Sequence, residues 1–144
     1  MLLADTNVWL ALALSKHQFH DAVRKWLTTC GPHEVVFCRS TQQSLLRLLT
    51  TRAVLAAYGI PPLSNQAAWS FYDRLIADER IVFVEEPSSL EAVWRKLSRG
   101  TSASPKLWTD AYLAAFAVAG GHRLVTTDQG FKQFKGLDLV GLCR

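Results

Sequence analysis

The sequence contains few cysteines, few charged residues and no long apolar run. Its three cysteines are odd in number and lack metal-ligand spacing, which argues against a disulfide framework and a cysteine-based metal site. They are Cys30, Cys38 and Cys143. We therefore expect reduced thiols in a cytoplasmic protein. No stretch of about 18 apolar residues occurs, so no membrane-spanning helix is expected.

The beginning of the sequence also lacks the features of a targeting segment. Residues 8–14 are all apolar, like the core of a signal peptide. However, Asp5 precedes them and no basic leader is present. We therefore expect this segment to belong to the fold.

The residues that are present are typical of one compact domain. Hydrophobic residues make up 49% of the 144 residues and charged residues 19%. A chain of this length buries roughly two thirds of its unfolded surface, so a single domain over residues 1–144 is expected. Sixteen Lys and Arg against twelve Asp and Glu give a net charge of +4. This excess suits a polyanionic partner, although scattered basic residues are also typical of an ordinary solvated surface.

Four short apolar runs, rich in β-branched residues, alternate with helical patterns. Such runs are typical of strands buried on both faces of a parallel sheet that helices cover. The runs are residues 2–4, 35–38, 81–84 and 124–126, and a fifth run at 137–142 can add an edge strand. The predicted fold is a three-layer α/β/α domain with a central parallel sheet of four or five short strands.

Helical patterns with recognisable start signals fill the segments between these runs. Helices are expected after Asp5, over residues 19–27, after a cap at Ser40 or Thr41, after a cap at Ser64, after a capping box of Ser88 and Glu91, and after a cap at Thr109. The segment 100–105, Gly-Thr-Ser-Ala-Ser-Pro, is the expected mobile loop.

Three aspartates, Asp5, Asp110 and Asp128, are the strongest candidates for chemistry. Asp5 and Asp128 follow predicted strands, at the end of a parallel sheet where ligands bind. Apolar residues lie three, four and seven positions after Asp110, so its carboxylate is expected on the inward face of a helix. A simpler interpretation is that each aspartate only caps a helix, and it fits Asp128 best.

Convergence of the three carboxylates would have chemical consequences. Mutual repulsion would raise the proton affinity of at least one of them, and a divalent cation would relieve this repulsion. Oxygen ligands favour a hard ion, so Mg²⁺ is the expected cofactor, with Mn²⁺ as a substitute. Such an ion activates water and neutralises charge on a phosphate. The aspartates therefore indicate hydrolysis of a phosphodiester.

The order and spacing of several short motifs resemble those of the PIN-domain ribonucleases over nearly the whole chain. Within that family, they are similar to the VapC toxins of bacterial type II toxin–antitoxin systems. The motifs are Asp5-Thr6-Asn7, His17-Gln18-Phe19-His20, Trp26-Leu27, Thr41-Gln42 with Leu45-Leu46-Arg47-Leu48-Leu49-Thr50, Thr109-Asp110-Ala111-Tyr112-Leu113 and Thr126-Thr127-Asp128.

The resemblance implies a Mg²⁺-dependent endoribonuclease that cuts selected tRNA, rRNA or mRNA. Asp5, Asp110 and Asp128 match three acidic positions of the family, which implies that they are catalytic and bind the metal. The resemblance further implies inhibition by a small VapB-like antitoxin protein and a homodimer that joins with this antitoxin.

The sequence departs from the family pattern at one acidic position. The family commonly has a further acid, usually Glu, early in the third helix, where this chain has Gln42, Gln43 and Ser44. A glutamine can coordinate through its amide oxygen or hold a metal-bound water, but it removes one negative charge. A second metal ion therefore becomes less favourable. Glu34 is not expected to substitute, because it precedes its strand and lies at the opposite end of the sheet.

Other polar and aromatic residues are weaker candidates. Thr6, Asn7, Gln42 and Thr127 can hydrogen-bond a carboxylate, water or phosphate near the site. His17 and His20 are expected to be structural or exposed. The candidates to contact RNA phosphates are Arg39, Arg47, Arg95, Lys96, Arg99 and Lys106. The stretch that contains Trp69, Phe71 and Tyr72 docks a partner or, as we expect, packs in the core.

Two other interpretations stay open. The first is a protein of similar fold that binds RNA without cutting it, because the acid of the third helix is missing. The second is a signalling receiver domain that accepts phosphate. Such a domain needs an acidic pair at the first strand, whereas Asp5 has Ala4 and Thr6 beside it.

Overall fold

Five parallel strands form one sheet in the computed structural model, which describes residues 1–143. The strands are β1 (Leu2–Ala4), β2 (Val35–Phe37), β3 (Ile81–Phe83), β4 (Arg123–Thr126) and β5 (Leu139–Gly141). Their order is β3-β2-β1-β4-β5, so β1 lies in the middle, between β2 and β4. Leu3 of β1 pairs with Val36 of β2 and with Leu124 of β4. The predicted parallel sheet is confirmed, with β5 at one edge.

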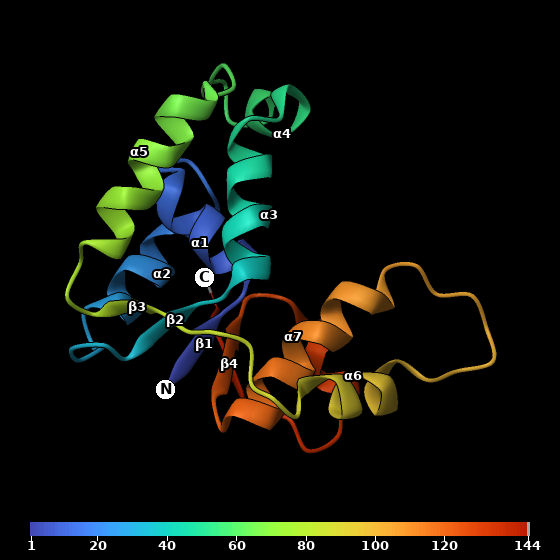
Figure 1. Cartoon of the computed structure of the whole chain (residues 1–144). Helices are drawn as coiled ribbons and strands as arrows, with labels where there is room; N and C mark the ends of the chain where they lie inside the picture. The colour runs from blue at the N-terminus through green and yellow to red at the C-terminus, as the bar shows by residue number, and fades with distance from the viewer. Residues whose placement is uncertain (144) are drawn as a thin grey trace.

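Helices cover both faces of this sheet. They are α1 (Thr6–Ala13), α2 (His20–Leu27), α3 (Arg39–Leu49), α4 (Arg52–Ala56), α5 (Asn65–Ile76), α6 (Leu90–Ser98), α7 (Leu107–Gly120) and the 3-10 helix η1 (Gln129–Gln133). Figure 1 shows α1 to α5 on one side of the sheet and α6 and α7 on the other. The three-layer α/β/α prediction is therefore confirmed. The segment between α6 and α7 extends away from the body of the molecule (Figure 1).

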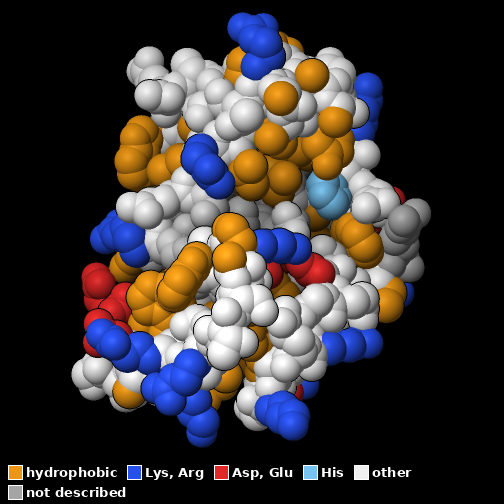
Figure 2. All heavy atoms as spheres, turned by 90° about the vertical axis from the view of Figure 1, so that its right-hand side faces the viewer, with side chains coloured by type: hydrophobic (Ala, Val, Ile, Leu, Met, Phe, Trp, Pro, Cys, Tyr) orange, Lys and Arg blue, Asp and Glu red, His pale blue; other side chains and the backbone are white. Residues whose placement is uncertain are grey.

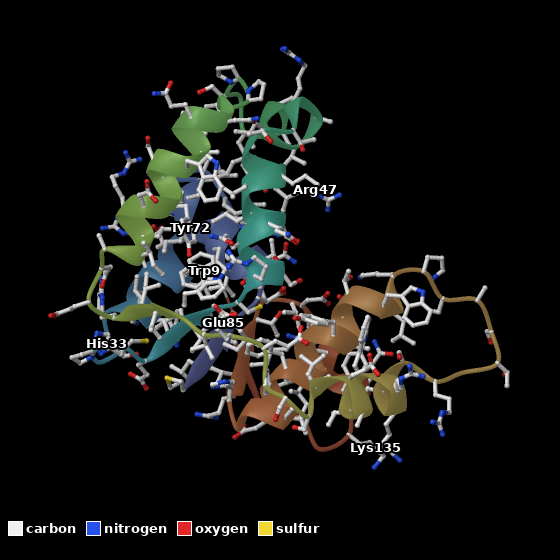
Figure 3. All side chains as sticks on the ribbon, viewed as in Figure 1. Trp9, His33, Arg47, Tyr72, Glu85 and Lys135 are labelled. Carbon is white, nitrogen blue, oxygen red and sulfur yellow. The ribbon has the colours of Figure 1, made fainter. Side chains whose placement is uncertain are left out.

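Alternate residues of each strand pack into two different cores. Phe37 of β2 packs in the core formed with α1 to α5, whereas its neighbour Val36 packs in the core formed with α6 and α7. In the first core, the rings of Trp9 and Phe37 stack with centroids 3.7 Å apart, and Tyr72 meets Phe37 edge-on (Figure 3). Because successive strand side chains point to opposite faces, strands buried on both faces are apolar throughout.

The predicted capping box of Ser88 and Glu91 is wrong. α6 begins at Leu90, and its N-cap residue Ser89 makes no side-chain cap hydrogen bond. The Glu91 carboxylate instead accepts a hydrogen bond from Arg95 Nε at 3.2 Å. The Glu91 side chain therefore forms an ion pair with a residue one turn later and does not form the capping box.

Two further helices begin earlier than predicted. The N-cap of α3 is Cys38, whose backbone N–H donates to Thr41 Oγ1 at 3.1 Å, so Thr41 lies inside the first turn. α7 begins at Leu107, so Thr109 also lies inside its helix. By contrast, Ser64 caps α5 as predicted, because its hydroxyl accepts a hydrogen bond from a backbone N–H of the first turn.

The apolar segment 8–14 belongs to the fold, since it forms most of α1 and its C-cap. Within residues 1–143, no helix has the length and hydropathy needed to cross a lipid bilayer. The three cysteines are unpaired: Cys38 is buried, Cys30 is partly buried and Cys143 is exposed.

Candidate functional site

Asp5 connects the end of β1 to the start of α1. Its backbone N–H donates to Val125 O at 2.9 Å, and its carbonyl oxygen accepts from Val8 N at 3.0 Å. Apart from a contact with the adjoining N–H of Thr6, its carboxylate makes no cap hydrogen bond to the helix, although the residue is only 6% exposed. A buried carboxylate that does not serve as a cap is costly for the fold. The capping interpretation therefore fails for Asp5.

Burial raises the pKa of the Asp5 carboxyl from 3.8 to about 6. The Thr126 hydroxyl and the backbone N–H of Thr6 oppose this rise by hydrogen-bonding the ionised form, whereas the negative charges of Asp110 and Asp128 add to it. The three aspartates therefore interact electrostatically.

Asp110 is the fourth residue of α7. It lies on the same helix face as Leu113, Ala114 and Ala117, which are buried. Burial raises the pKa of its carboxyl; the ammonium group of Lys106, one turn earlier, opposes the rise, and the charge of Asp128 adds to it. Asp110 therefore presents a half-buried negative charge along the inward side of the helix.

Asp128 follows β4 by two residues and caps η1. Its Oδ1 accepts a hydrogen bond from Gly130 N at 2.8 Å, and its Oδ2 lies 3.8 Å from Lys106 Nζ. The lysine side chain is largely exposed, so this ion pair contributes little to stability. The capping interpretation thus holds for Asp128, the residue that it fitted best.

Thr126, the last residue of β4, connects two of the aspartates. Its hydroxyl donates to Asp5 Oδ2 at 2.9 Å and accepts from Asp128 N at 2.9 Å. The sequence alone favoured Thr127, which makes no side-chain hydrogen bond within residues 1–143. The strand register is the missing signal, because the pairing of Ala4 with Val125 places Thr126 beside Asp5.

Replacing Thr126 with valine is expected to lower the free energy of unfolding by about 1–3 kcal/mol, because the Asp5 carboxylate and the Asp128 N–H both lose a partner. It should also raise the pKa of the Asp5 carboxyl further. Urea unfolding of Thr126→Val beside Thr127→Val measures the first effect, and the control should stay within about 0.5 kcal/mol of the parent. Equal stability of the two variants would show that the hydrogen bonds of the Thr126 hydroxyl contribute nothing to the free energy of unfolding.

The chemistry of these side chains suits a hard divalent cation, although they form no closed cage. Three carboxylates offer only oxygen ligands, and the pKa of Asp5 is raised first by burial and then by the charges of Asp110 and Asp128. Across residues 1–143, no three His, Cys, Asp or Glu side chains lie close enough together to hold a metal ion by themselves. Mg²⁺ commonly binds one or two carboxylates, several waters and a substrate phosphate, so it tolerates an open site. The three-aspartate metal site stays a prediction.

Figure 2 shows acidic side chains near the middle of one face of the molecule and basic side chains scattered over that face. Acidic side chains lie in a hollow in the middle of this face, between an upper and a lower part of the molecule, with a basic side chain beside them. Arg47 projects from α3 on the side of that helix where α7 lies (Figure 3). A polyanion that approached this hollow would therefore meet positive charge at its edge.

Gln42, which stands where the family has an acid, is buried and already has a partner. Its Oε1 accepts a hydrogen bond from Arg39 NH1 at 2.6 Å, and the Arg39 guanidinium lies over the Phe83 ring, 4.6 Å from its centroid. Gln43 is exposed and Ser44 is partly buried. The amide oxygen of Gln42 is thus occupied by a positive charge of the same chain.

The remaining polar candidates have modest local roles. Thr6 supplies its backbone N–H to the Asp5 carboxylate, and Asn7 is exposed. Glu34 directly precedes β2, at the opposite end of the sheet as predicted, and its Oε2 accepts from Gly31 N at 2.6 Å.

The histidines are structural, as predicted, whereas the core prediction for the aromatic stretch is wrong for Trp69. Nδ1 of His17 accepts a hydrogen bond from a backbone N–H, and Nδ1 of His20 lies 2.8 Å from a backbone carbonyl oxygen of α1. Tyr72 and Phe71 pack in the first core, whereas Trp69 is 50% exposed.

Comparison with known protein sequences identifies related proteins. The model of the PIN domain family matches residues 2–137. Ribonuclease VapC41 of Mycobacterium tuberculosis is 57% identical over 141 residues, which cover 96% of this chain and 97% of that protein. Ribonuclease VapC31 of the same organism is 30% identical over 138 residues, which cover 93% of each protein.

Solved structures with a similar fold come from toxin–antitoxin proteins. VapBC2 from Rickettsia felis, bound to a DNA fragment from its promoter, gives a TM-score of 0.68 at 14% identity and covers 99% of this chain and 98% of that chain. VapC20 of Mycobacterium tuberculosis, a Sarcin-Ricin loop cleaving toxin, gives 0.63 at 18% identity and covers 92% and 93%. At these identities the structures show the fold alone, and membership rests on the sequence matches. The chain belongs to the PIN domain family, among the VapC ribonucleases.

Proposed function

We propose that this protein is a metal-dependent endoribonuclease and the toxin of a toxin–antitoxin pair. The observation that carries the proposal is the Asp5 carboxylate, which is buried, serves no cap and has a pKa of about 6 beside two further carboxylates. A carboxylate that only caps a helix does not need to be buried, whereas a buried carboxylate near two partly buried ones gains from a bound cation. Similarity to proteins named as VapC ribonucleases further supports the proposal.

Asp5, Asp110 and Asp128 would hold one Mg²⁺ or Mn²⁺ ion. When bound, such an ion supplies Lewis acidity toward a water molecule and a phosphate oxygen. The protein contributes orientation and charge. Thr126 fixes the Asp5 carboxylate, and Lys106 places a positive charge beside Asp128, where it can attract an RNA phosphate.

The test is cleavage of RNA by protein purified free of any antitoxin. Total bacterial RNA is incubated with the protein in Mg²⁺, in Mn²⁺ and in EDTA, and new 5′ ends are mapped. Discrete cuts in either metal but not in EDTA are the expected result, and the mapped ends would name the target among tRNA, rRNA and mRNA. Cuts that persist in EDTA would contradict the proposed metal dependence.

Mg²⁺ is also expected to stabilise the folded protein, because the unfolded chain lacks the site. A concentration of about 100 times Kd stabilises by about 2.7 kcal/mol, which for a chain of this length raises Tm by about 5–10 °C. Calorimetric scans in MgCl₂ and in NaCl of equal ionic strength measure the difference. Asp110→Asn is the matched control and should respond less. An unchanged Tm for the parent protein across millimolar Mg²⁺ would argue against a metal site.

The partners follow from the same proposal. A small VapB-like antitoxin would inhibit the nuclease, and the protein would form a homodimer that joins with this antitoxin in the cytoplasm. Solved relatives of the same fold include VapBC complexes, which supports an antitoxin partner. A strictly monomeric protein in analytical sedimentation, with and without a coexpressed antitoxin, would contradict the assembly.

One observation favours a second candidate, a protein that binds RNA without cutting it. Gln42 replaces the expected acid, and Arg39 occupies its amide oxygen, so the centre carries less negative charge for a cation. Bound but uncut RNA in every metal condition would favour this candidate over the nuclease.

A further inference from the structure

Basic residues gather on α6 and on the segment that joins α6 to α7. We call residues 92–109 the basic arm; they contain four Lys and Arg residues and no Asp or Glu. The four are Arg95, Lys96, Arg99 and Lys106. In Figure 1 the middle of this arm projects from the body of the molecule. The basic arm is therefore a concentrated positive surface on a chain whose net charge is only +4.

The basic arm contains a pocket of about 470 Å³ lined by two tryptophans. The rings of Trp94 and Trp108 meet edge to face with centroids 6.3 Å apart. Arg99, Arg95 and the Glu91 carboxylate that pairs with Arg95 also line the pocket. Trp94 is held in place, because its Nε1–H donates to Trp108 O at 3.0 Å and its ring packs edge-on against Tyr112. Trp108 is 58% exposed, so its ring is available for stacking.

This pocket lies near the acidic site but on another side of α7. Trp108 and Asp110 lie in the same turn of α7, and Lys106, just before that helix, pairs with Asp128. Because residues two positions apart point to different sides of a helix, the Trp108 ring and the Asp110 carboxylate do not face each other. An RNA strand with a phosphate at the aspartates can pass around the N-terminus of α7 and place a base a few nucleotides away in the pocket.

The charge of the arm indicates which occupant the pocket accepts. Two copies of this chain that met through the basic arm would bring their arginines and lysines together, and like charges disfavour such a contact. Single-stranded nucleic acid combines a polyanionic backbone with flat apolar bases, so it complements an exposed indole ring with cationic groups beside it. Figure 2 shows hydrophobic side chains beside Lys and Arg side chains on the lower part of this face.

We infer that the pocket of the basic arm binds an unpaired base of the RNA a few nucleotides from the cleaved phosphodiester. The base stacks on Trp108, and a flanking phosphate lies near Arg99, because Arg95 already pairs with Glu91. This inference rests on the proposed ribonuclease function and adds a contact outside the acidic site that takes up one base of the strand. Duplex RNA keeps its bases stacked on one another and does not offer one to the pocket.

The test measures RNA binding without cleavage, in the Asp5→Asn background and in EDTA. The probe is a fluorescein-labelled, unstructured RNA of about ten nucleotides, and its affinity is measured by anisotropy at fixed salt. Trp108→Leu should weaken binding about tenfold, whereas Trp108→Phe should keep most of the affinity. The matched control is Trp69→Leu, an equally exposed tryptophan on α5, which should not change the affinity.

A second probe separates the base from the backbone. A strand of the same length whose bases are replaced by abasic sites should bind Trp108→Leu and its parent equally, because only phosphates are left to bind. Equal affinity of Trp108→Leu and its parent for the normal strand would overturn the inference. A change from dimer to monomer in Trp108→Leu without loss of RNA affinity would also overturn it. Absence of cleavage by the wild-type protein would contradict the nuclease but leave this binding result intact.

Discussion

Replacing Asp5 with asparagine is expected to reduce RNA cleavage by at least about 10³-fold while the protein stays folded. Asparagine has nearly the same shape as aspartate, and its carbonyl oxygen can still accept the hydrogen bond from Thr126 Oγ1. It lacks the negative charge that a divalent cation requires. A bound cation contributes several kcal/mol to transition-state stabilisation, and each 1.4 kcal/mol corresponds to about tenfold in rate.

Cleavage rates of a defined target RNA in Mg²⁺ measure this effect. Asp138→Asn is the matched control, because the Asp138 carboxylate is exposed, pairs with Arg123 Nε at 3.1 Å and lies near the opposite end of the sheet. The control should cleave at the parental rate, which would also show that activity does not come from a contaminating nuclease. An Asp5→Asn protein that kept more than about a tenth of the activity would remove Asp5 from the reaction.

The same replacement is expected to stabilise the fold at neutral pH by up to about 3 kcal/mol when no metal is present. The pKa of the Asp5 carboxyl rises from 3.8 to about 6 on folding, and each unit of pKa corresponds to about 1.36 kcal/mol. The ionised carboxylate therefore opposes folding at pH 7, and a neutral asparagine removes this opposition. A loss of activity would then accompany a gain in stability, as is common for residues selected for function.

The direction of the Asp5 pKa shift determines how the stability difference between Asp5→Asn and the parent changes with pH. Between pH 3.8 and about 6, the folded protein binds more protons at Asp5 than the unfolded chain does, so this group destabilises the fold as pH rises through that interval. The stability difference between Asp5→Asn and the parent should be largest above about pH 6 and disappear below about pH 4. Urea unfolding in EDTA across this range measures it. A difference that did not vary with pH would contradict the raised pKa, and added Mg²⁺ should narrow the difference by stabilising only the parent.

Much of the fold could be predicted because burial on both faces leaves a strong pattern in the sequence. The runs that became β1 to β4 are apolar at successive positions, and this holds only where helices cover both sides of the sheet. Helix starts were harder to predict. Cys38 is a poor N-cap by composition, and it serves as one because Thr41 Oγ1 accepts its backbone N–H.

The candidate site could be proposed from residue types, but its contacts could not be predicted. Asp5, Asp110 and Asp128 were chosen from their positions beside strand ends and helix starts, and their role as a metal site stays a prediction. The bridge through Thr126 depends on the register of two strands. The pairing of Gln42 with Arg39 is local, because the two residues lie three positions apart on α3. The strand register and the contact of Arg39 with Phe83 of β3 are tertiary features that local patterns do not encode.

The link between Thr126 and Asp5 joins residues that are 121 positions apart in the chain. Because β1 and β4 pair in parallel, the carboxylate is held in place only after β4 has docked against β1. During translation, Asp5 leaves the ribosome long before its partners on α7 and β4 do. A growing chain whose α7 and β4 have not yet emerged therefore cannot assemble this centre, and the proposed nuclease would be harmless to its own ribosome until both have emerged.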